Sequence, residues 1–276
     1  MIKNLFILIL FCFIGLLSFA QTKHALIVAI GNYPDRMKNG WATINSLNDV
    51  PLIKNALVEN QHFSERNIQV LTDSQATKKG IEDALDKLIA SVKKDDIVVI
   101  HFSSHGEQIE DDNNDEVDGL DETIVPYGAV YSADPEKFAQ YASGYFRDDL
   151  FGEKVTQIRN KLGKNGDVLV IIDACHSGSG TRGVETAKIR GGNTPMVSNK
   201  FAARNLSNVH DSAVFKESTV TKLNADAATY VLISGAQAKE VNYECYDDNE
   251  NAVGSLSYCL SKTLSSLKGT ITYRGL

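Results

Sequence analysis

Residues 167–178, which read Asp-Val-Leu-Val-Ile-Ile-Asp-Ala-Cys-His-Ser-Gly, most constrain what this chain can fold into. The run of β-branched and apolar residues predicts a strand buried on both faces, as in a parallel sheet. The run ends in Asp173, Cys175 and His176, where the carboxyl ends of strands in open α/β sheets bind ligands. Cys175 is therefore a candidate nucleophile, and an inert core cysteine is the alternative for an isolated thiol.

A second strand ending supplies a partner for this thiol. Residues 97–103 are mostly apolar and β-branched, and they are followed by Ser104, His105 and Gly106. A free thiol has a pKa of about 8.5 and is mostly protonated at neutral pH, so a nucleophilic cysteine needs a base or a cation nearby. Because neighbouring strands end at the same sheet edge, we predict that His105 takes up the thiol proton. His101, inside the strand, is expected to be a core residue.

Apolar strands alternate along the chain with amphipathic helices, which predicts right-handed βαβ units and a mainly parallel sheet covered on both faces. The expected strands are residues 24–31, 67–71, 97–103, 168–172 and 229–234. The expected helices are residues 48–60, 81–92, 148–162 and 256–267. Residues 111–122 are predicted to form an acidic loop. Residues 178–225 lose periodicity and predict a long loop, which carries Arg182, Lys188, Arg190, Lys200 and Arg204.

The composition is that of one folded domain, with 43% hydrophobic and 23% charged residues in a chain of 276. The formal net charge of −7 argues against nucleic acid as a partner, because phosphate binding needs basic patches.

Residues 1–20 predict a secretory signal peptide. Lys3 gives a basic start, residues 5–17 are uncharged and mostly apolar, and Ala20 precedes the expected cleavage point. The apolar run is too short to span a bilayer comfortably, and an uncleaved anchor is the alternative. We expect a secreted or periplasmic domain of residues 21–276 with no stable membrane insertion after cleavage.

Of the three cysteines that remain after cleavage, Cys245 and Cys259 could form a disulfide in an oxidising compartment.

The two strand endings resemble the histidine and cysteine motifs of metacaspases, in the caspase-like clan of cysteine peptidases. The resemblance rests on His105-Gly106 and on the run from Asp173 to Gly178, and it covers nearly all of the chain from about His24. It implies a caspase-like three-layer sandwich. It also implies a large-subunit-like part to about residue 180, a long loop at about 180–226 and a small-subunit-like part at about 227–276. Family members usually continue with a further helix and strand beyond the point that corresponds to Leu276.

The resemblance also implies roles for individual residues. The amides of Gly106 and Cys175 would stabilise the oxyanion. Metacaspases cut after Arg or Lys, and the acids of their primary pocket correspond to Asp49 and Asp173, with Ser103 beside them. A buried guanidinium needs such opposed carboxylates. The alternative for Asp49 is an ordinary acid at a helix N-terminus, where the helix dipole favours it.

A calcium site is a further implication of the resemblance. Family calcium sites use acids that correspond to Asp121, Asp148 and Asp149, but Arg182 stands near the place of the fourth acid. The acidic stretch from Asp111 has part of an EF-hand spacing without its glycine, and a solvated acidic loop is the alternative. We therefore expect no required cofactor, with calcium as a possible ligand.

The sequence thus predicts a secreted cysteine endopeptidase that cleaves protein or peptide substrates after Arg or Lys with a Cys175–His105 dyad. Such an enzyme could also process itself within its own basic loop. The alternatives are a catalytically silent caspase-like module that binds peptides, and a gingipain-like or legumain-like peptidase of the same clan.

Overall fold

Five parallel strands form the central sheet of the computed structural model, in the order β2-β1-β3-β7-β8. They are β1 Lys23–Ala29, β2 Ile68–Thr72, β3 Ile97–Ser103, β7 Asp167–Asp173 and β8 Thr229–Ser234. The structure describes residues 21–34, 40–116, 118–175, 188–192, 194–202, 221–237 and 240–267. The predicted signal peptide, His176, much of the long loop and the end of the chain from residue 268 lie outside the described residues.

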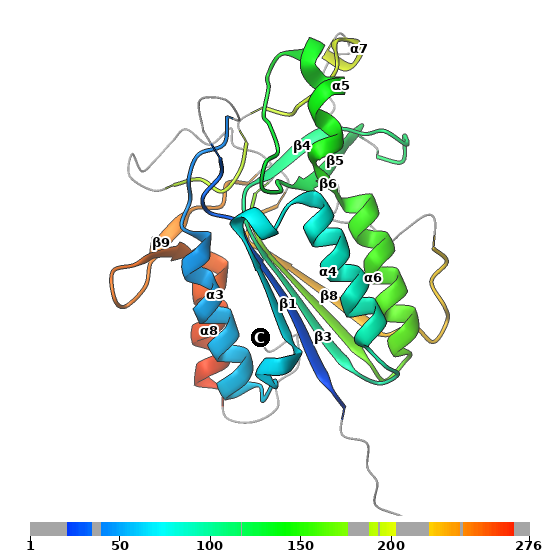
Figure 1. The fold of residues 1–276 in the computed structure, drawn as a ribbon, viewed down its shortest axis with the longest axis vertical. Coiled ribbons are helices and arrows are strands. Elements are labelled where there is room, and N and C mark those ends of the chain that lie inside the picture. Colours follow the sequence, from blue (N-terminus) through cyan, green and yellow to red (C-terminus); the bar gives the residue numbers. More distant parts are fainter. Residues whose placement is uncertain are drawn as a thin grey trace, which may run out of the picture.

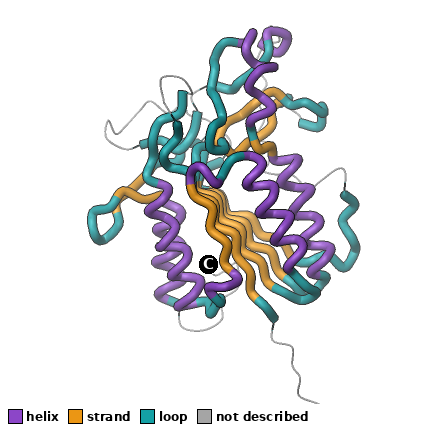
Figure 2. Tube along the Cα trace, viewed as in Figure 1, coloured by secondary structure: helices purple, strands orange, loops and turns teal. Residues whose placement is uncertain are grey.

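Helices cover both faces of this sheet, which confirms the predicted α/β class (Figure 1). One face packs against α4 Lys78–Ser91 and α6 Asp148–Leu162, and the other against α3 Asp49–Asn55 and α8 Ser255–Ser266. A π-helical turn, Ala56–Asn60, extends α3. The three layers are also clear in Figure 2.

Alternation along the strands supplies a core on each side of the sheet. On β7, Val168, Val170 and Ile172 belong to the core under α4 and α6, whereas Leu169 and Ile171 face α3 and α8. Successive strand side chains point to opposite faces, so a strand buried on both sides needs apolar residues at every position. This is why the three inner strands β1, β3 and β7 could be predicted from nearly continuous apolar runs.

Two smaller β-structures were not predicted. Strands β4 Gly106–Glu110, β5 Leu120–Ile124 and β6 Phe146–Arg147 form an antiparallel sheet, and β9 Glu244–Tyr246 pairs with β10 Ala252–Gly254. The predicted acidic loop at 111–122 is therefore wrong at its C-terminal end. Asp121 and Glu122 are buried strand residues opposite Ile109 and Gln108, where ladder pairing outweighs their low strand propensity.

The remaining elements are short. They are α5 Phe138–Tyr141, α7 Asn199–Ala202 and the 3₁₀ turns Ser46–Asn48, Glu65–Asn67, Asp73–Gln75, Pro135–Lys137 and Ala142–Gly144. Among the described residues, no helix combines the length and apolar character needed to cross a membrane. Cys245 and Cys259 are both free thiols.

Candidate active site

The ends of β3 and β7 bring the predicted nucleophile and base to one edge of the sheet. Ser103 pairs with Asp173 at the last position of the two strands, so His105 and Cys175 each follow two residues later. The backbone amides of Gly106 and Cys175 donate hydrogen bonds to one acceptor, the carbonyl oxygen of Arg190, at N···O distances of 3.1 and 3.0 Å. This is the arrangement that an oxyanion-binding pair of amides requires.

His105 is held in one orientation. Its Nε2 lies 2.9 Å from the Ala42 carbonyl oxygen, which can only accept, so Nε2 carries the proton and Nδ1 keeps a lone pair. Nδ1 is buried and has no hydrogen-bond partner among the described residues. The imidazole ring of His105 lies against the rings of Trp41 and Tyr33, at centroid distances of 5.0 and 5.1 Å respectively. The Tyr33 hydroxyl also accepts a hydrogen bond from the His105 amide.

Burial sets the protonation of both groups. It lowers the pKa of His105 to about 4, against the opposing effect of the Ala42 carbonyl. It raises the pKa of the Cys175 thiol to about 11. At neutral pH the pair is therefore a thiol beside a neutral imidazole, and proton transfer has to accompany attack by the sulfur.

The three predicted substrate-binding residues do come together, and a side chain of this same chain occupies the space between them. The Nη1 of Arg190 lies 2.7 Å from Asp49 Oδ2, 2.7 Å from Ser103 Oγ and 3.7 Å from Asp173 Oδ1. Arg190 is fully buried. Burial disfavours the charge of Arg190, but the carboxylates of Asp173 and Asp49 outweigh it, and the pKa of Arg190 is raised.

Residues between 242 and 257 complete this pocket and were not predicted. Glu244 on β9 lies 3.3 Å from Nη2 of Arg190. The Asn242 side chain and the Ser257 amide donate to the two oxygens of Asp173, and the Gly254 amide donates to Asp49. Glu244 sits in an acidic stretch without a motif, so no sequence signal separates it from its neighbours.

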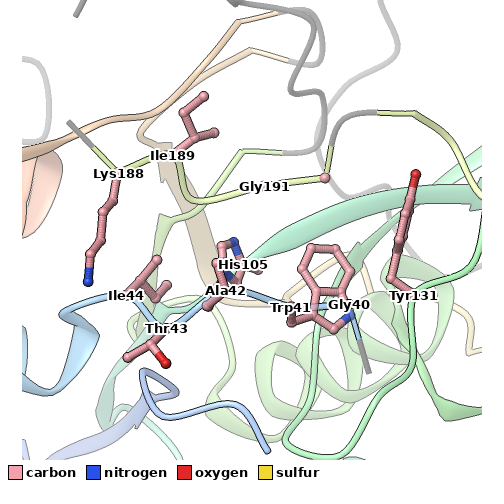
Figure 3. A pocket seen from close by; sticks show the side chains of 11 residues that line it. Gly40, Trp41, Ala42, Thr43, Ile44, His105, Tyr131, Lys188, Ile189 and Gly191 are labelled. Carbon is pink, nitrogen blue, oxygen red and sulfur yellow. Dashed lines mark hydrogen bonds between the residues drawn. The ribbon is translucent and has the colours of Figure 1, made fainter. Parts of the chain in front are cut away.

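The backbone around Arg190 is bound on both sides, as an extended peptide would be. Upstream, the Arg190 amide donates to the Asn242 carbonyl, and the Glu244 amide donates to the Lys188 carbonyl. Downstream, Gly192 donates to the Gly106 carbonyl at 3.0 Å. A cavity of about 530 Å³ opens beside this segment, with His105 between the stretch at 41–44 and the segment that carries Ile189 and Gly191 (Figure 3).

The predicted metal ligands separate into two environments. Asp121 and Asp149 have carboxylate oxygens within 4.8 Å of each other and of Asp112, whereas Asp148 lies outside this group. Burial, with the nearby charge of Glu122, raises the pKa of Asp148 well above its usual range. A guanidinium, that of Arg147, already bridges Asp112 and Asp121. Asp121 Oδ1 is buried without a hydrogen-bond partner among the described residues, so a hard cation could use it.

A thiol and an imidazole on adjacent strand ends, with two amides on one carbonyl, define the site of a cysteine hydrolase. The Caspase domain family model matches residues 22–273, and the chain belongs to that family of cysteine peptidases.

Curated relatives agree with this family assignment. Metacaspase-2 of Arabidopsis thaliana is 33% identical over 165 residues, which cover 57% of this chain and 35% of the relative. Metacaspase-1 of Eremothecium gossypii is 26% identical over 252 residues, or 79% of this chain and 52% of the relative. The chain thus spans between about a third and a half of these relatives.

The fold also resembles a solved structure. Protein GSU0716 of Geobacter sulfurreducens matches with a TM-score of 0.58 and 22% identity, over 92% of this chain and 85% of that one. At this identity the likeness concerns the fold alone.

Proposed function

We propose that the protein is a cysteine endopeptidase that cleaves after arginine, and more slowly after lysine, and that the Arg190–Gly191 bond is its first substrate. The observation that carries this proposal is the placement of Arg190. Its side chain lies among Asp49, Asp173 and Glu244, and its carbonyl oxygen accepts from the Gly106 and Cys175 amides. A planar guanidinium suits several carboxylates better than a lysine ammonium does.

The proposed reaction follows from these contacts. The Cys175 sulfur attacks the Arg190 carbonyl carbon while His105 Nδ1 takes the thiol proton. The Gly106 and Cys175 amides hold the negative charge that develops on the carbonyl oxygen. His105 then gives the proton to the Gly191 nitrogen, the peptide bond breaks and an acyl-enzyme forms. Water, deprotonated by His105, hydrolyses the thioester and restores the thiol.

Self-cleavage would also regulate access. As long as Arg190 fills the pocket, the arginine of another protein has no room among the same three acids. Cleavage frees a new N-terminus at Gly191 and lets both ends of the cut segment leave. We propose that the uncut chain is a precursor that its own first cleavage activates.

The test is to follow the purified full chain by mass spectrometry. We expect cleavage between Arg190 and Gly191, loss of all cleavage in Cys175→Ala, and at least about a hundredfold slower cleavage of this bond in Arg190→Ala, because buried ion pairs are lost. The matched control is Lys200→Ala, since Lys200 is an exposed basic residue on the short helix α7, ten residues further along the chain. Unchanged cleavage of the purified Cys175→Ala protein would contradict the proposal. An intact chain that also leaves arginine peptides uncut would instead favour the silent peptide-binding module.

Export stays a proposal that rests on the composition of residues 1–20. Calcium binding is a second proposal, supported by the clustered oxygens of Asp112, Asp121 and Asp149. A bound cation would supply charge that fixes this end of the β4-β5-β6 sheet.

For calcium to bind, the Arg147 guanidinium has to leave the two carboxylates that it bridges. We therefore expect Arg147→Ala to bind Ca²⁺ at least about tenfold more tightly than the parent chain, the equivalent of about 1.4 kcal/mol. Isothermal titration calorimetry measures this, with Asp121→Asn expected to abolish binding and the exposed Asp134→Asn to leave it unchanged. Absence of binding at millimolar Ca²⁺ in both the parent chain and Arg147→Ala would rule the site out.

A further inference from the structure

Two glycines follow Arg190, and each passes through a place with no room for a side chain. A Cβ atom built on Gly191 would lie 2.6 Å from the Cys175 sulfur and closer still to the Cys175 carbonyl oxygen. A Cβ atom on Gly192 would overlap the Glu107 carboxyl group, 2.5 Å from its carbon and 2.8 Å from Oε1. Neither glycine has the positive φ that would by itself call for glycine. Space, rather than backbone conformation, restricts both positions.

Glu107 is the group that closes the second of these places. It is fully buried on β4, one residue after the oxyanion amide of Gly106. Its Oε1 accepts a hydrogen bond of 2.9 Å from the Gln108 amide, which fixes the carboxyl group. Its Oε2 is buried and has no hydrogen-bond partner among the described residues. The reaction proposed above does not use this side chain.

The bound segment also has a fixed path across Glu107. The Gly192 amide donates to the Gly106 carbonyl, and the Met196 amide donates to the Gln108 carbonyl, so the segment runs parallel to β4. A substrate that adopts this pairing presents the second residue after the cut to Glu107. Burial raises the pKa of Glu107 well above its usual range, which favours the neutral carboxyl group over a carboxylate that attracts cations.

We propose that Glu107 is a specificity-determining residue that restricts the second position after the cleaved bond to glycine. Together with the limit that Cys175 sets at the first position, it makes Arg-Gly-Gly sequences the preferred substrate class. This inference rests on the proposed cleavage after arginine.

The experiment compares three peptides that differ only after the arginine: Arg-Gly-Gly, Arg-Gly-Ala and Arg-Ala-Gly. The enzymes are the self-cleaved parent, Glu107→Ala and the nearly isosteric Glu107→Gln. In the parent we expect kcat/KM for Arg-Gly-Gly to exceed that for each alanine peptide by at least about tenfold, since a tight site rejects one extra carbon to this extent. In Glu107→Ala the preference over Arg-Gly-Ala should fall to about twofold or less. The preference over Arg-Ala-Gly should persist, because it depends on the Cys175 backbone.

Glu107→Gln separates volume from charge, because it keeps the size of the side chain and should keep the preference for glycine. Equal cleavage of Arg-Gly-Gly and Arg-Gly-Ala by the parent overturns the inference and leaves arginine cleavage intact. Faster cleavage of an Arg-Gly-Lys peptide by the parent also overturns it, since an attractive carboxylate would then be at work. If none of the arginine peptides is cut, the proposed function fails, and this inference fails with it. The parent series alone decides the matter if Glu107→Ala does not fold.

Discussion

Asp49→Asn and Asp173→Asn are each expected to lower kcat/KM for arginine peptides by about 10²–10⁴-fold. Each substitution removes one charge from a buried pocket whose ligand carries the opposite charge, and loss of one partner of a buried pair costs roughly 3–5 kcal/mol. Both carboxylates are fully buried, so the bound guanidinium depends on them for its opposite charge. Fluorogenic peptides that end in arginine, tested on the self-cleaved enzyme, measure the effect.

The loss expected for the two aspartate variants can be compared with that for Ser103, the neutral residue of the same pocket. Ser103→Ala removes a neutral hydrogen bond, which contributes about 0.5–1.5 kcal/mol, so its effect should stay near tenfold or below. The half-buried Asp83 on α4 pairs with Lys79, and Asp83→Asn is the matched control that should leave arginine cleavage unchanged. An Asp49→Asn enzyme with full arginine activity would return Asp49 to the role of an ordinary helix N-terminal acid. Its observed contacts argue otherwise, since its oxygens bind Gly254, Ser103 and Arg190.

The sequence was most informative where one local rule decides the structure. Residues 97–103 and 167–173 are apolar at nearly every position, so a buried parallel strand was the one consistent interpretation. Parallel strands of one sheet end at one edge, so the sequence alone predicts that His105 and Cys175 lie together. The amphipathic helices α4 and α6 followed from spacing in the same way.

The remainder depends on contacts between residues far apart in the chain. Glu107 and Glu122 lie on strands that local propensity disfavours, and the pairing of β4 with β5 stabilises these strands. Nothing in the long loop distinguishes one cation from another. Arg190 enters the pocket because Ile189 pairs with Tyr243, more than fifty residues away. The Arg190 amide donates to the Asn242 carbonyl, and the Lys188 carbonyl accepts from the Glu244 amide. The register of that pairing selects one cation from the set Arg182, Lys188, Arg190, Lys200 and Arg204.

Replacing His105 with alanine is expected to lower cleavage after arginine by about 10²–10⁴-fold, the usual contribution of a positioned general base. The sign of the pH effect follows from burial. With Arg190 in the pocket, the pKa of His105 is lowered to about 4, so the imidazole is neutral at every pH well above 4. When the segment leaves, water returns, the Arg190 charge departs, and the pKa of His105 should rise toward its usual value of about 6.5. The acid limb of kcat/KM for the self-cleaved enzyme should then lie above pH 4, and activity should fall as the pH drops through it.

Trp41 offers a direct measurement of this shift, because it is the one tryptophan in the sequence and its ring lies 5.0 Å from that of His105. A cation within about 6 Å of an indole interacts with its π system, so protonation of His105 should change the Trp41 emission. In Cys175→Ala, which keeps the segment uncut, we expect a transition near pH 4. In the double variant Cys175→Ala/Arg190→Ala the transition should move upward, and adding His105→Gln should remove it, with far-ultraviolet circular dichroism to exclude unfolding. The same midpoint with and without Arg190 would mean that the segment does not control the base, and the account of the uncut chain as a precursor would lose its electrostatic support.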